Sequence, residues 1–366
     1  MGAIRLGYVA ALLWAIGAAA NAQIVIGQTA GITGPVAASV NETIAGARLL
    51  LDAVNAQGGI HGETVEVVRL DDGFDPKRAG ENGRVLVEER KVLALFMTRG
   101  TPHTQAIIPH LDRHGVPLIG PSTGAMVLHK PIQRHVFNVR STYQREAEKA
   151  VQHLSTVGMN RIAVVYVTDS FGADALEGAR RGLSQAKIEP AAVVEADRDK
   201  PDYAVIVPQL VQARAQAVVW IGSGTAVIEG VKALRAAGSA AQVVTLSNNA
   251  SSGFIQQLGT ASRGVIVTQV FPNERSVATP MVKEAMALAR GKELSPAMLE
   301  GFASAKVLLE ALRRTGPKPT RARLLATLES LRDYDLGGLE VSYSPQDHIG
   351  IDYADLSIIS EGRFRR

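Results

Sequence analysis

The fold class is decided by one stretch of the chain, residues 161–196, which reads RIAVVYVTDSFGADALEGARRGLSQAKIEPAAVVEA. Its first part, Arg161–Thr168, and its last part, Ala191–Ala196, are short apolar runs rich in valine, which are typical of buried strands. Between them, Gly172–Lys187 has the length and pattern of a helix. A strand, a helix and a second strand in this order predict a parallel pair joined by a helical crossover.

The same alternation runs from Gln23 through most of the chain. Further strands are predicted at Ile24–Gln28, Thr64–Leu70, Val92–Thr98, Val116–Gly120, Gln216–Gly222, Gln242–Ser247 and Gly264–Phe271. Further helices are predicted at Val40–Ala56, Pro76–Glu89, Pro102–His114, Arg145–Val157, Thr279–Arg290 and Pro296–Thr315, before a shorter helix and two late strands. Two series of strands favour an α/β fold with two doubly wound lobes, each with helices on both faces of its sheet.

Length and composition agree with two lobes and exclude several classes of protein. A chain of 366 residues is long enough for two hydrophobic cores. With 46% hydrophobic and 20% charged residues, disorder and coiled coils are disfavoured. A net charge of +4, without a long basic run and with only 5% aromatic residues, argues against nucleic-acid binding. The absence of cysteine excludes disulfides, thiolate metal sites and cysteine nucleophiles.

The first 22 residues have the pattern of an export signal. Arg5 is the only charge in Met1–Ala22, and an apolar run follows over Leu6–Ala20. This run of about 15 residues is short for a membrane span, which leaves an uncleaved anchor as the weaker alternative. Because Ala20-Asn21-Ala22 fits the small-x-small cleavage pattern, we expect cleavage after Ala22 and an exported protein without stable membrane insertion.

The loops at the carboxyl ends of the predicted strands share small hydroxyl residues and glycine. They are Thr29–Gly34, Thr98–Thr101, Gly120–Gly124, Gly222–Thr225 and Ser247–Asn249. Ligands of open α/β sheets bind at these strand ends, and hydroxyl groups beside free helix N–H groups suit a small anion such as a carboxylate. The alternative is that these residues are ordinary helix caps and turns.

The segment Gly120–Gly124 also fits the G-x-S-x-G pattern of serine hydrolases, with Ser122 as the nucleophile. Asp347 and His348 are available downstream as partners, although Pro121 restricts the sharp turn that such a nucleophile needs. An exported serine hydrolase is therefore an alternative function.

Other chemistry has weaker support. His110 and His114 have a metal-chelating spacing, but no H-E-x-x-H accompanies them, and His103 lies about 10 Å away along the same helix. A solvated helix face explains these histidines better. The chain contains neither a P-loop nor G-x-G-x-x-G after its first strand. We therefore expect no cofactor, no metal and no enzymatic activity.

Several motifs resemble those of a known family over almost the whole length from Gln23. They are Gly31–Pro35, Ala45–Ala47, Asn55–Gly62, Asp71–Pro76, Gly120–Ala125, Asp169–Gly172 and Glu300–Phe302. The chain resembles the periplasmic leucine/isoleucine/valine-binding proteins, which are type I solute-binding proteins of branched-chain amino-acid ABC transporters. The pattern N-A-x-G-G-I-x-G followed by D-D-x-x-D-P is the most specific part of this likeness.

The resemblance implies two lobes that close on a ligand and are joined by three crossing segments, near Val139–Thr142, Val270–Asn273 and Leu339–Ser342. The N-terminal lobe would comprise residues 23–140 and 272–341, and the C-terminal lobe residues 141–271 and 342–366. The implied partners are a small amino acid or organic acid and an ABC permease, and the implied location is the periplasm. A sensor receptor of the same fold is an alternative that the sequence does not separate from a transport receptor.

The resemblance also implies a ligand site. Thr101 would hold the ligand carboxylate, the next loop would contact carboxylate and ammonium, and the other positions would line the pocket. Besides Thr101 these are Ser122, Thr123, Gly124, Phe171, Gly224 or Thr225, Ser39 and Phe302. Arg99, beside the carboxylate position, would strengthen anion binding, unless it is a surface cation at a strand end.

One position departs from the family pattern. Amino-acid-binding members carry an acid for the ligand ammonium after the strand that here ends at Leu246, whereas this chain reads Ser247-Asn248-Asn249. Asn248 can accept a hydrogen bond but supplies no opposing charge. Either Asp169 or Glu300 compensates, or the ligand lacks an ammonium and is a small aromatic or aliphatic carboxylate or an amide.

Overall fold

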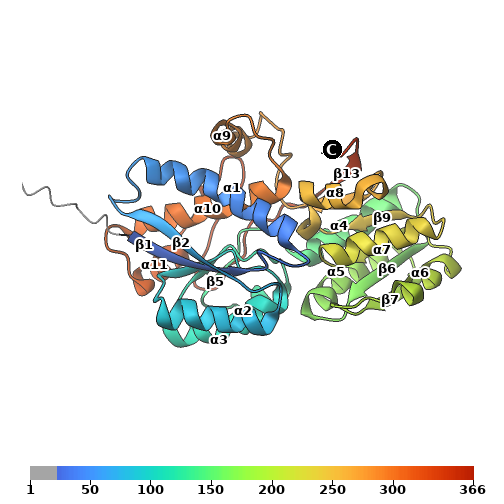
Figure 1. Ribbon diagram of the computed structural model, residues 1–366, viewed down its shortest axis with the longest axis horizontal. Coiled ribbons are helices and arrows are strands. Elements are labelled where there is room, and N and C mark those ends of the chain that lie inside the picture. Colours follow the sequence, from blue (N-terminus) through green and yellow to red (C-terminus); the bar gives the residue numbers. More distant parts are fainter. Residues whose placement is uncertain (1–22) are drawn as a thin grey trace, which may run out of the picture.

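The computed structural model describes residues 23–366, so the predicted signal segment lies outside the described residues. Two α/β lobes lie side by side along the long axis of the molecule (Figure 1). The first lobe holds a five-stranded sheet of order β2-β1-β3-β4-β5, and the second a seven-stranded sheet of order β14-β13-β10-β9-β8-β6-β7. The predicted fold class is thereby confirmed.

The first sheet is parallel throughout and covered on both faces. Its strands are β1 (Gln23–Ala30), β2 (Thr64–Asp71), β3 (Ala94–Phe96), β4 (Leu118–Ile119) and β5 (Val136–Phe137). One face packs on α1 (Ala37–Ala56), α9 (Pro280–Ala289), α10 (Pro296–Thr315) and α11 (Arg321–Glu329). The other packs on α2 (Pro76–Arg84), the π-helical turn η1 (Val85–Glu89) and α3 (Thr101–His114). The short elements η2 (Met126–Leu128), β11 (Tyr334–Asp335) and β12 (Glu340–Val341) complete this part of the chain.

The second sheet is parallel except at one edge. Its parallel strands are β6 (Ile162–Val167), β7 (Ala192–Ala196), β8 (Ala217–Ile221), β9 (Gln242–Thr245) and β10 (Ile266–Gln269), and its antiparallel strands are β13 (Asp355–Ser360) and β14 (Arg363–Arg365). The helices and turns around it are α4 (Tyr143–Thr156), α5 (Ser170–Ala186), α6 (Tyr203–Gln212), α7 (Thr225–Ala236), η3 (Ser247–Asn249), α8 (Ser252–Leu258) and η4 (Gly259–Ser262). No helix among residues 23–366 combines the length and apolar character that a membrane crossing requires.

Capping side chains set the starts of many helices. The carboxylates of Asp75, Asp169 and Asp202 accept hydrogen bonds from backbone N–H groups in the first turns of α2, α5 and α6. Hydroxyl groups do the same for α4, α8, α10 and α11. Because a cap satisfies N–H groups that the helix itself leaves free, these residues fix where each of these helices begins.

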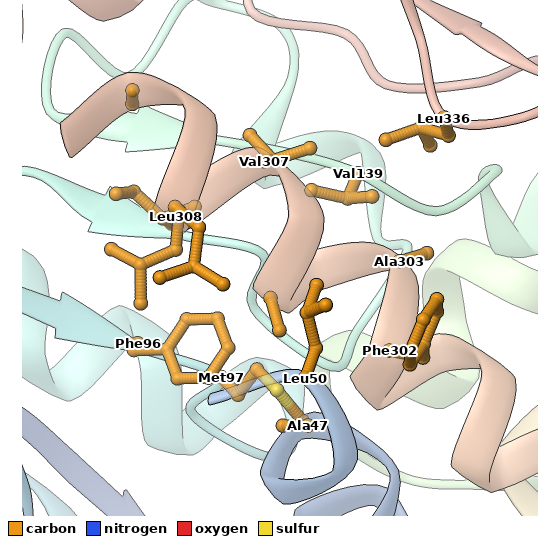
Figure 2. Close-up of a cluster of buried hydrophobic side chains, with 14 of the residues drawn as sticks. Ala47, Leu50, Phe96, Met97, Val139, Phe302, Ala303, Val307, Leu308 and Leu336 are labelled. Carbon is orange, nitrogen blue, oxygen red and sulfur yellow. The ribbon is translucent and has the colours of Figure 1, made fainter. Parts of the chain in front are cut away.

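The core of the first lobe depends on close contact between α1 and α10. Figure 2 shows side chains of both helices, including Leu50 and Leu308, gathered near Phe96 of β3. A Cβ atom on Gly301 would lie 1.9 Å from the carbonyl oxygen of Thr43, and one on Gly46 would lie 1.9 Å from that of Met298. Glycine at both positions therefore lets the two backbones touch.

We expect Gly301→Ala to lower the free energy of unfolding by about 1–3 kcal/mol, because the added methyl group must push two helices apart. The midpoint of urea unfolding measures this loss, and Gly46→Ala is expected to behave alike because it meets the partner helix in the same way. An unchanged midpoint in both variants would contradict this account of the helix contact.

The chain crosses between the lobes in three places, and one of them lies later than expected. The first crossing separates β5 from α4 and the second separates β10 from α9, as the ranges Val139–Thr142 and Val270–Asn273 suggested. Residues beyond Leu339–Ser342 still belong to the first lobe: Tyr343 and Ile351 are part of its core. The third crossing therefore falls between Ile351 and β13, since only the core packing reveals where this irregular segment belongs.

Candidate functional site

A cavity of about 250 Å³ lies between the two lobes. The first lobe contributes Pro35, Phe74 and the segment Arg99–Pro102, and the second contributes residues from the carboxyl ends of its strands and the loops that follow. The lobes touch beside the cavity, where the N–H of Thr225 donates to the carbonyl oxygen of Pro35 (3.2 Å). A cavity of this size, lined by both lobes, fits a small molecule.

Arg99 is the central charge of the cavity. Its backbone follows β3 and pairs with Ser122 beyond the end of β4, and Gly100, with φ of 90°, turns the chain into α3. Only 3% of Arg99 is exposed. Its guanidinium donates to Ser122 Oγ (3.0 Å), to Ser39 Oγ (3.2 Å) and, across the cleft, to the carbonyl oxygen of Asn248 (2.6 Å).

No Asp or Glu among the described residues forms an ion pair with Arg99. Three of its five N–H groups have partners in the protein, and all three partners are neutral oxygen atoms. Burial lowers the pKa of the Arg99 guanidinium, but arginine stays protonated in proteins. Arg99 is therefore not a surface cation but a buried positive charge at the cavity wall without a negative partner.

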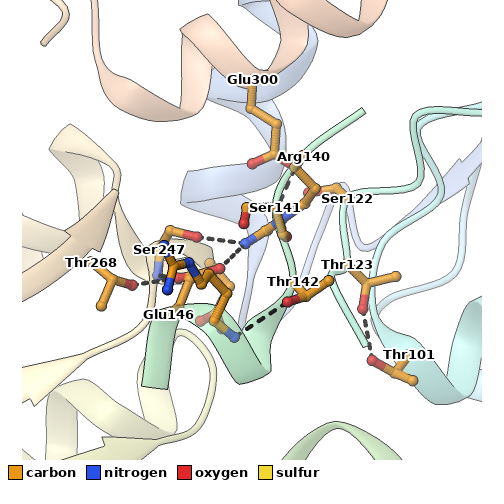
Figure 3. A network of polar contacts seen from close by, with 12 residues as sticks. Thr101, Ser122, Thr123, Arg140, Ser141, Thr142, Glu146, Ser247, Thr268 and Glu300 are labelled. Carbon is orange, nitrogen blue, oxygen red and sulfur yellow. Dashed lines mark hydrogen bonds and ion pairs between the residues drawn. The ribbon is translucent and has the colours of Figure 1, made fainter. Parts of the chain in front are cut away.

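Four of the expected site residues line the cavity: Thr101, Phe171, Thr225 and Asn248. Thr101 opens α3, and its hydroxyl lies 2.7 Å from that of Thr123 (Figure 3). Phe171 lies at the start of α5 and contacts Tyr143 edge-on, with ring centroids 4.7 Å apart.

The other expected site residues lie behind the wall. Ser39 and Ser122 hold Arg99, and Thr123 holds Thr101. A Cβ on Gly124 would lie 2.5 Å from the carbonyl oxygen of Ser141, so this glycine lets its loop pass the first crossing segment. Phe302 does not line the cavity, because its ring points into the core of the first lobe and is fully buried there (Figure 2).

Asp169 and Glu300, the two acids that could replace the family's ammonium-binding acid, lie in different places. Asp169 lines the cavity, but its Oδ2 lies 3.2 Å from Nη1 of Arg198. Glu300 lies away from the cavity, with its Oε1 3.7 Å from Nη1 of Arg140. At the position where the chain differs from the family pattern, Asn248 Nδ2 donates to the carbonyl oxygen of Gly222. Asn248 Oδ1 is buried without a hydrogen-bond partner.

Comparison with known proteins identifies the family. The sequence profile described as "Periplasmic binding protein" matches residues 23–359. The chain belongs to the leucine/isoleucine/valine-binding family of periplasmic binding proteins. The expectation drawn from the motifs is thereby confirmed.

Two relatives and two solved structures illustrate the likeness. This periplasmic binding protein is 24% identical to Leu/Ile/Val-binding protein homolog 3 of Brucella melitensis, over 94% of each chain. It is 21% identical to the leucine-specific-binding protein of Salmonella typhimurium, over 86% of this chain and 83% of the relative. A substrate-binding periplasmic protein from Ralstonia solanacearum is 32% identical, with a TM-score of 0.85 and coverage of 92% and 97%. A branched-chain amino acid ABC transporter structure from Thermus thermophilus with bound valine, 18% identical, has a TM-score of 0.82 over 94% of each chain.

In the part of the chain that the structure describes, Ser122 has no partners arranged for serine hydrolysis. Ser122 Oγ accepts from Arg99, and no histidine of residues 23–366 hydrogen-bonds to it. His348 lies elsewhere, stacked on Phe137, with Nδ1 3.1 Å from the carbonyl oxygen of Val136. A nucleophilic serine needs an adjacent base, whereas Ser122 instead supports Arg99.

The histidines of α3 have other roles in the periplasmic binding protein. His110 and His114 both face Glu88 of η1, at 3.5 Å and 3.1 Å, and they stay partly exposed. His103 does not share this solvated face, because it is buried against the second lobe. Within the described part of the chain, no three His, Asp or Glu side chains are placed to hold a metal ion.

A buried polar network, which no sequence motif indicated, joins the lobes beside the cavity (Figure 3). Arg140, in the first crossing segment, donates to Glu146 of α4 and to Ser247 Oγ (2.6 Å). Glu146 also accepts from the Ser247 N–H (2.9 Å) and from the hydroxyl of Thr268. Carboxylates nearby raise the pKa of Arg140 above its usual value, against the opposing effect of burial. The network fixes the end of the first crossing to the second lobe.

His103 lies where the two lobes meet. Its ring stacks on Phe74 (4.3 Å) and lies 3.1 Å from Nη2 of Arg198, which comes from the second lobe. Burial lowers the pKa of His103 to about 4, and the charges of Arg198 and Arg99 act in the same direction while Asp75 opposes them.

We expect the closed form to lose population as the pH falls from 7.5 to 5. Burial holds the pKa of His103 below its usual value of 6.5, so protonation of His103 opposes the closed form. The contact between His103 and the second lobe is therefore at full strength above about pH 6.5 and weakens as the pH falls toward about 4. The shift can reach about tenfold per pH unit over that range. Small-angle X-ray scattering measures it, and His103→Gln is the control that removes the titration. A pH dependence that survives in His103→Gln would assign it to another group.

Proposed function

We propose that this protein is the extracytoplasmic solute receptor of an ABC importer and captures a small carboxylate-bearing molecule between its lobes. Relatives named as Leu/Ile/Val-binding and leucine-specific-binding proteins, and the valine-bound structure from an ABC transporter, support this proposal. The periplasm is the location that agrees with the family and with the predicted signal segment.

The observation that carries the proposal is the unpaired charge of Arg99. A guanidinium buried without an acid costs free energy, because neutral oxygens replace its water only in part. A ligand carboxylate at the cavity wall would remove this cost and form charge-assisted hydrogen bonds. A cavity with such a cation therefore favours an anionic ligand.

In this proposal, the ligand is held by residues from both lobes. Arg99 and Thr101 of the first lobe would hold the carboxylate, while Phe171, Thr225 and Asn248 of the second lobe would close over the remainder. Ser39, Ser122, Thr123 and Gly124 support the first two residues from behind.

Because the two sets meet only when the lobes are closed, the ligand would stabilise the closed form by its differential affinity. The closed form is then the species that docks on a membrane permease, and no bond in the ligand is made or broken.

Isothermal titration calorimetry with matched acids and amides tests the proposal. The pairs are leucine and leucinamide, 4-methylpentanoate and 4-methylpentanamide, and 3-phenylpropanoate and 3-phenylpropanamide. At least one acid should bind, and its amide should bind at least about thirtyfold more weakly, since loss of a buried charge pair costs 2 kcal/mol or more. Equal binding of acids and amides, or no binding by any acid, would refute the carboxylate receptor.

A further inference from the structure

The charges around the cavity indicate what the ligand carries besides its carboxylate, an argument that rests on the proposed function. An α-amino acid brings an ammonium group as well, and burying an ammonium requires an anion or a full set of acceptors. Three carboxylates line the cavity, those of Asp169, Asp199 and Glu229. Whether one of them can receive an ammonium decides the class of ligand.

None of the three is a free buried anion. Asp169 Oδ1 accepts from the N–H of Gly172 (2.9 Å), and Asp169 Oδ2 pairs with Arg198. The side chain of Asp199 is 84% exposed. That of Glu229 is 57% exposed and pairs with Lys232 at 3.1 Å. The two exposed carboxylates lie in water at the cavity mouth, where a charge pair contributes little.

The polar group that remains is neutral. Asn248 is 2% exposed, and its Nδ2 is engaged by Gly222 and by the hydroxyl of Ser223 (2.9 Å each). This leaves the buried Oδ1 as an acceptor without a donor. It can accept one hydrogen bond from a neutral O–H or N–H, but it cannot balance the charge of an ammonium.

Four aromatic residues lie in the rest of the wall, beside proline, valine and alanine residues. Phe74, Tyr143, Phe171 and Tyr203 all line the cavity, although the whole chain holds only 8 Phe, 7 Tyr and 2 Trp. Phe171 meets Tyr143 edge-on, while the Phe74 ring stacks on His103 (4.3 Å) and has the guanidinium of Arg198 4.7 Å from its centre. Aromatic pairs in edge-on or offset arrangements gain roughly 0.5–1.5 kcal/mol beyond the burial of apolar area, so this wall favours an aromatic ring over a branched alkyl chain.

We propose that the ligand is an aromatic monocarboxylate without an ammonium group, with its carboxylate at Arg99 and its ring between Phe74, Tyr143, Phe171 and Tyr203. The ligand carboxylate then pairs with the one buried cation of the cavity wall that has no acid partner in the described part of the chain. An amino acid in the same place would leave its ammonium beside Asn248 with no opposing charge.

Calorimetry with 3-phenylpropanoate, phenylalanine, 4-methylpentanoate and leucine tests this proposal. Phenylalanine differs from 3-phenylpropanoate only in its ammonium group, and leucine differs from 4-methylpentanoate in the same way. We expect 3-phenylpropanoate to bind at least tenfold more tightly than phenylalanine and more tightly than 4-methylpentanoate. Phenylalanine or leucine binding as tightly as its partner without the ammonium would overturn the proposal but leave the carboxylate receptor standing. If none of the four binds, both proposals fail.

A second measurement places Asn248 beside the ligand. Asn248→Asp has nearly the same shape and introduces an anion at this wall. We expect at least tenfold weaker binding of 3-phenylpropanoate and a smaller preference for it over phenylalanine, once a thermal melt has shown that the variant is folded. Affinities that match the unmodified protein for both compounds would overturn the placement of Asn248.

Discussion

Arg99→Met is expected to abolish most of the affinity for the carboxylate ligand. The substitution keeps a long apolar side chain but removes the only fully buried cation that lines the cavity in residues 23–366. Truncating one partner of a buried, hydrogen-bonded charge pair costs about 2–5 kcal/mol. The dissociation constant, measured by calorimetry, should therefore rise by roughly 30-fold to several thousand-fold.

The same variant should remain about as stable as the unmodified protein in the absence of ligand. Methionine leaves three oxygen atoms without the hydrogen bonds that Arg99 donates, but it also removes a buried charge that has no acid beside it. Arg180→Met, at an exposed position of α5, is the matched control and should leave both affinity and stability unchanged. If Arg99→Met binds the ligand normally, the carboxylate does not lie at Arg99.

Glu146→Ala is expected to cause a large loss of stability. Glu146 is fully buried and accepts from Arg140, from the N–H of Ser247 and from the hydroxyl of Thr268. Its removal leaves Arg140 buried with Glu300 as its remaining ion-pair partner, at 3.7 Å. Breaking a buried ion pair from one side costs about 3–5 kcal/mol, which should appear as a lower midpoint in urea unfolding.

An exposed glutamate serves as the control for this loss. Glu177→Ala changes the same residue type on the exposed face of α5, and substitutions of that kind stay within about 0.5 kcal/mol. A triple substitution, Arg140→Met with Glu146→Leu and Glu300→Met, should recover part of the stability, because it removes the three buried charges together. Equal midpoints for Glu146→Ala and Glu177→Ala would show that the network contributes nothing to stability.

The sequence predicted the regular elements closely because their signals are local. The helix Pro296–Thr315 has the bounds that its apolar pattern indicated, and its start is fixed by Ser295 and a proline at the first helical position. Strands were predicted too long, as for Val116–Gly120, of which only Leu118–Ile119 is paired as a strand. Apolar runs continue beyond the paired residues, since buried strand ends are as apolar as strand centres.

The candidate site was harder to predict than the fold. The strand-end loops were located correctly, because parallel strands bring their carboxyl ends to one edge of a sheet. Phe302 was misplaced because a helix that is buried on most sides gives no sign of which side faces a cavity. The third crossing was placed too early because Tyr343 and Ile351 lie in a segment without periodicity, and only their packing assigns them to the first lobe.

The sequence by itself determined two doubly wound lobes, a pattern for export, and hydroxyl-rich loops facing a cleft, since each depends on neighbouring residues in the chain. The tertiary structure alone decided that Arg99 is buried without an acid, that Asp169 is paired with Arg198, and that Asn248 has a free acceptor. The physical reason is that the free energy of a charge depends on burial and on partners within a few ångströms. Those partners come from positions far apart in the chain, and folding brings them together.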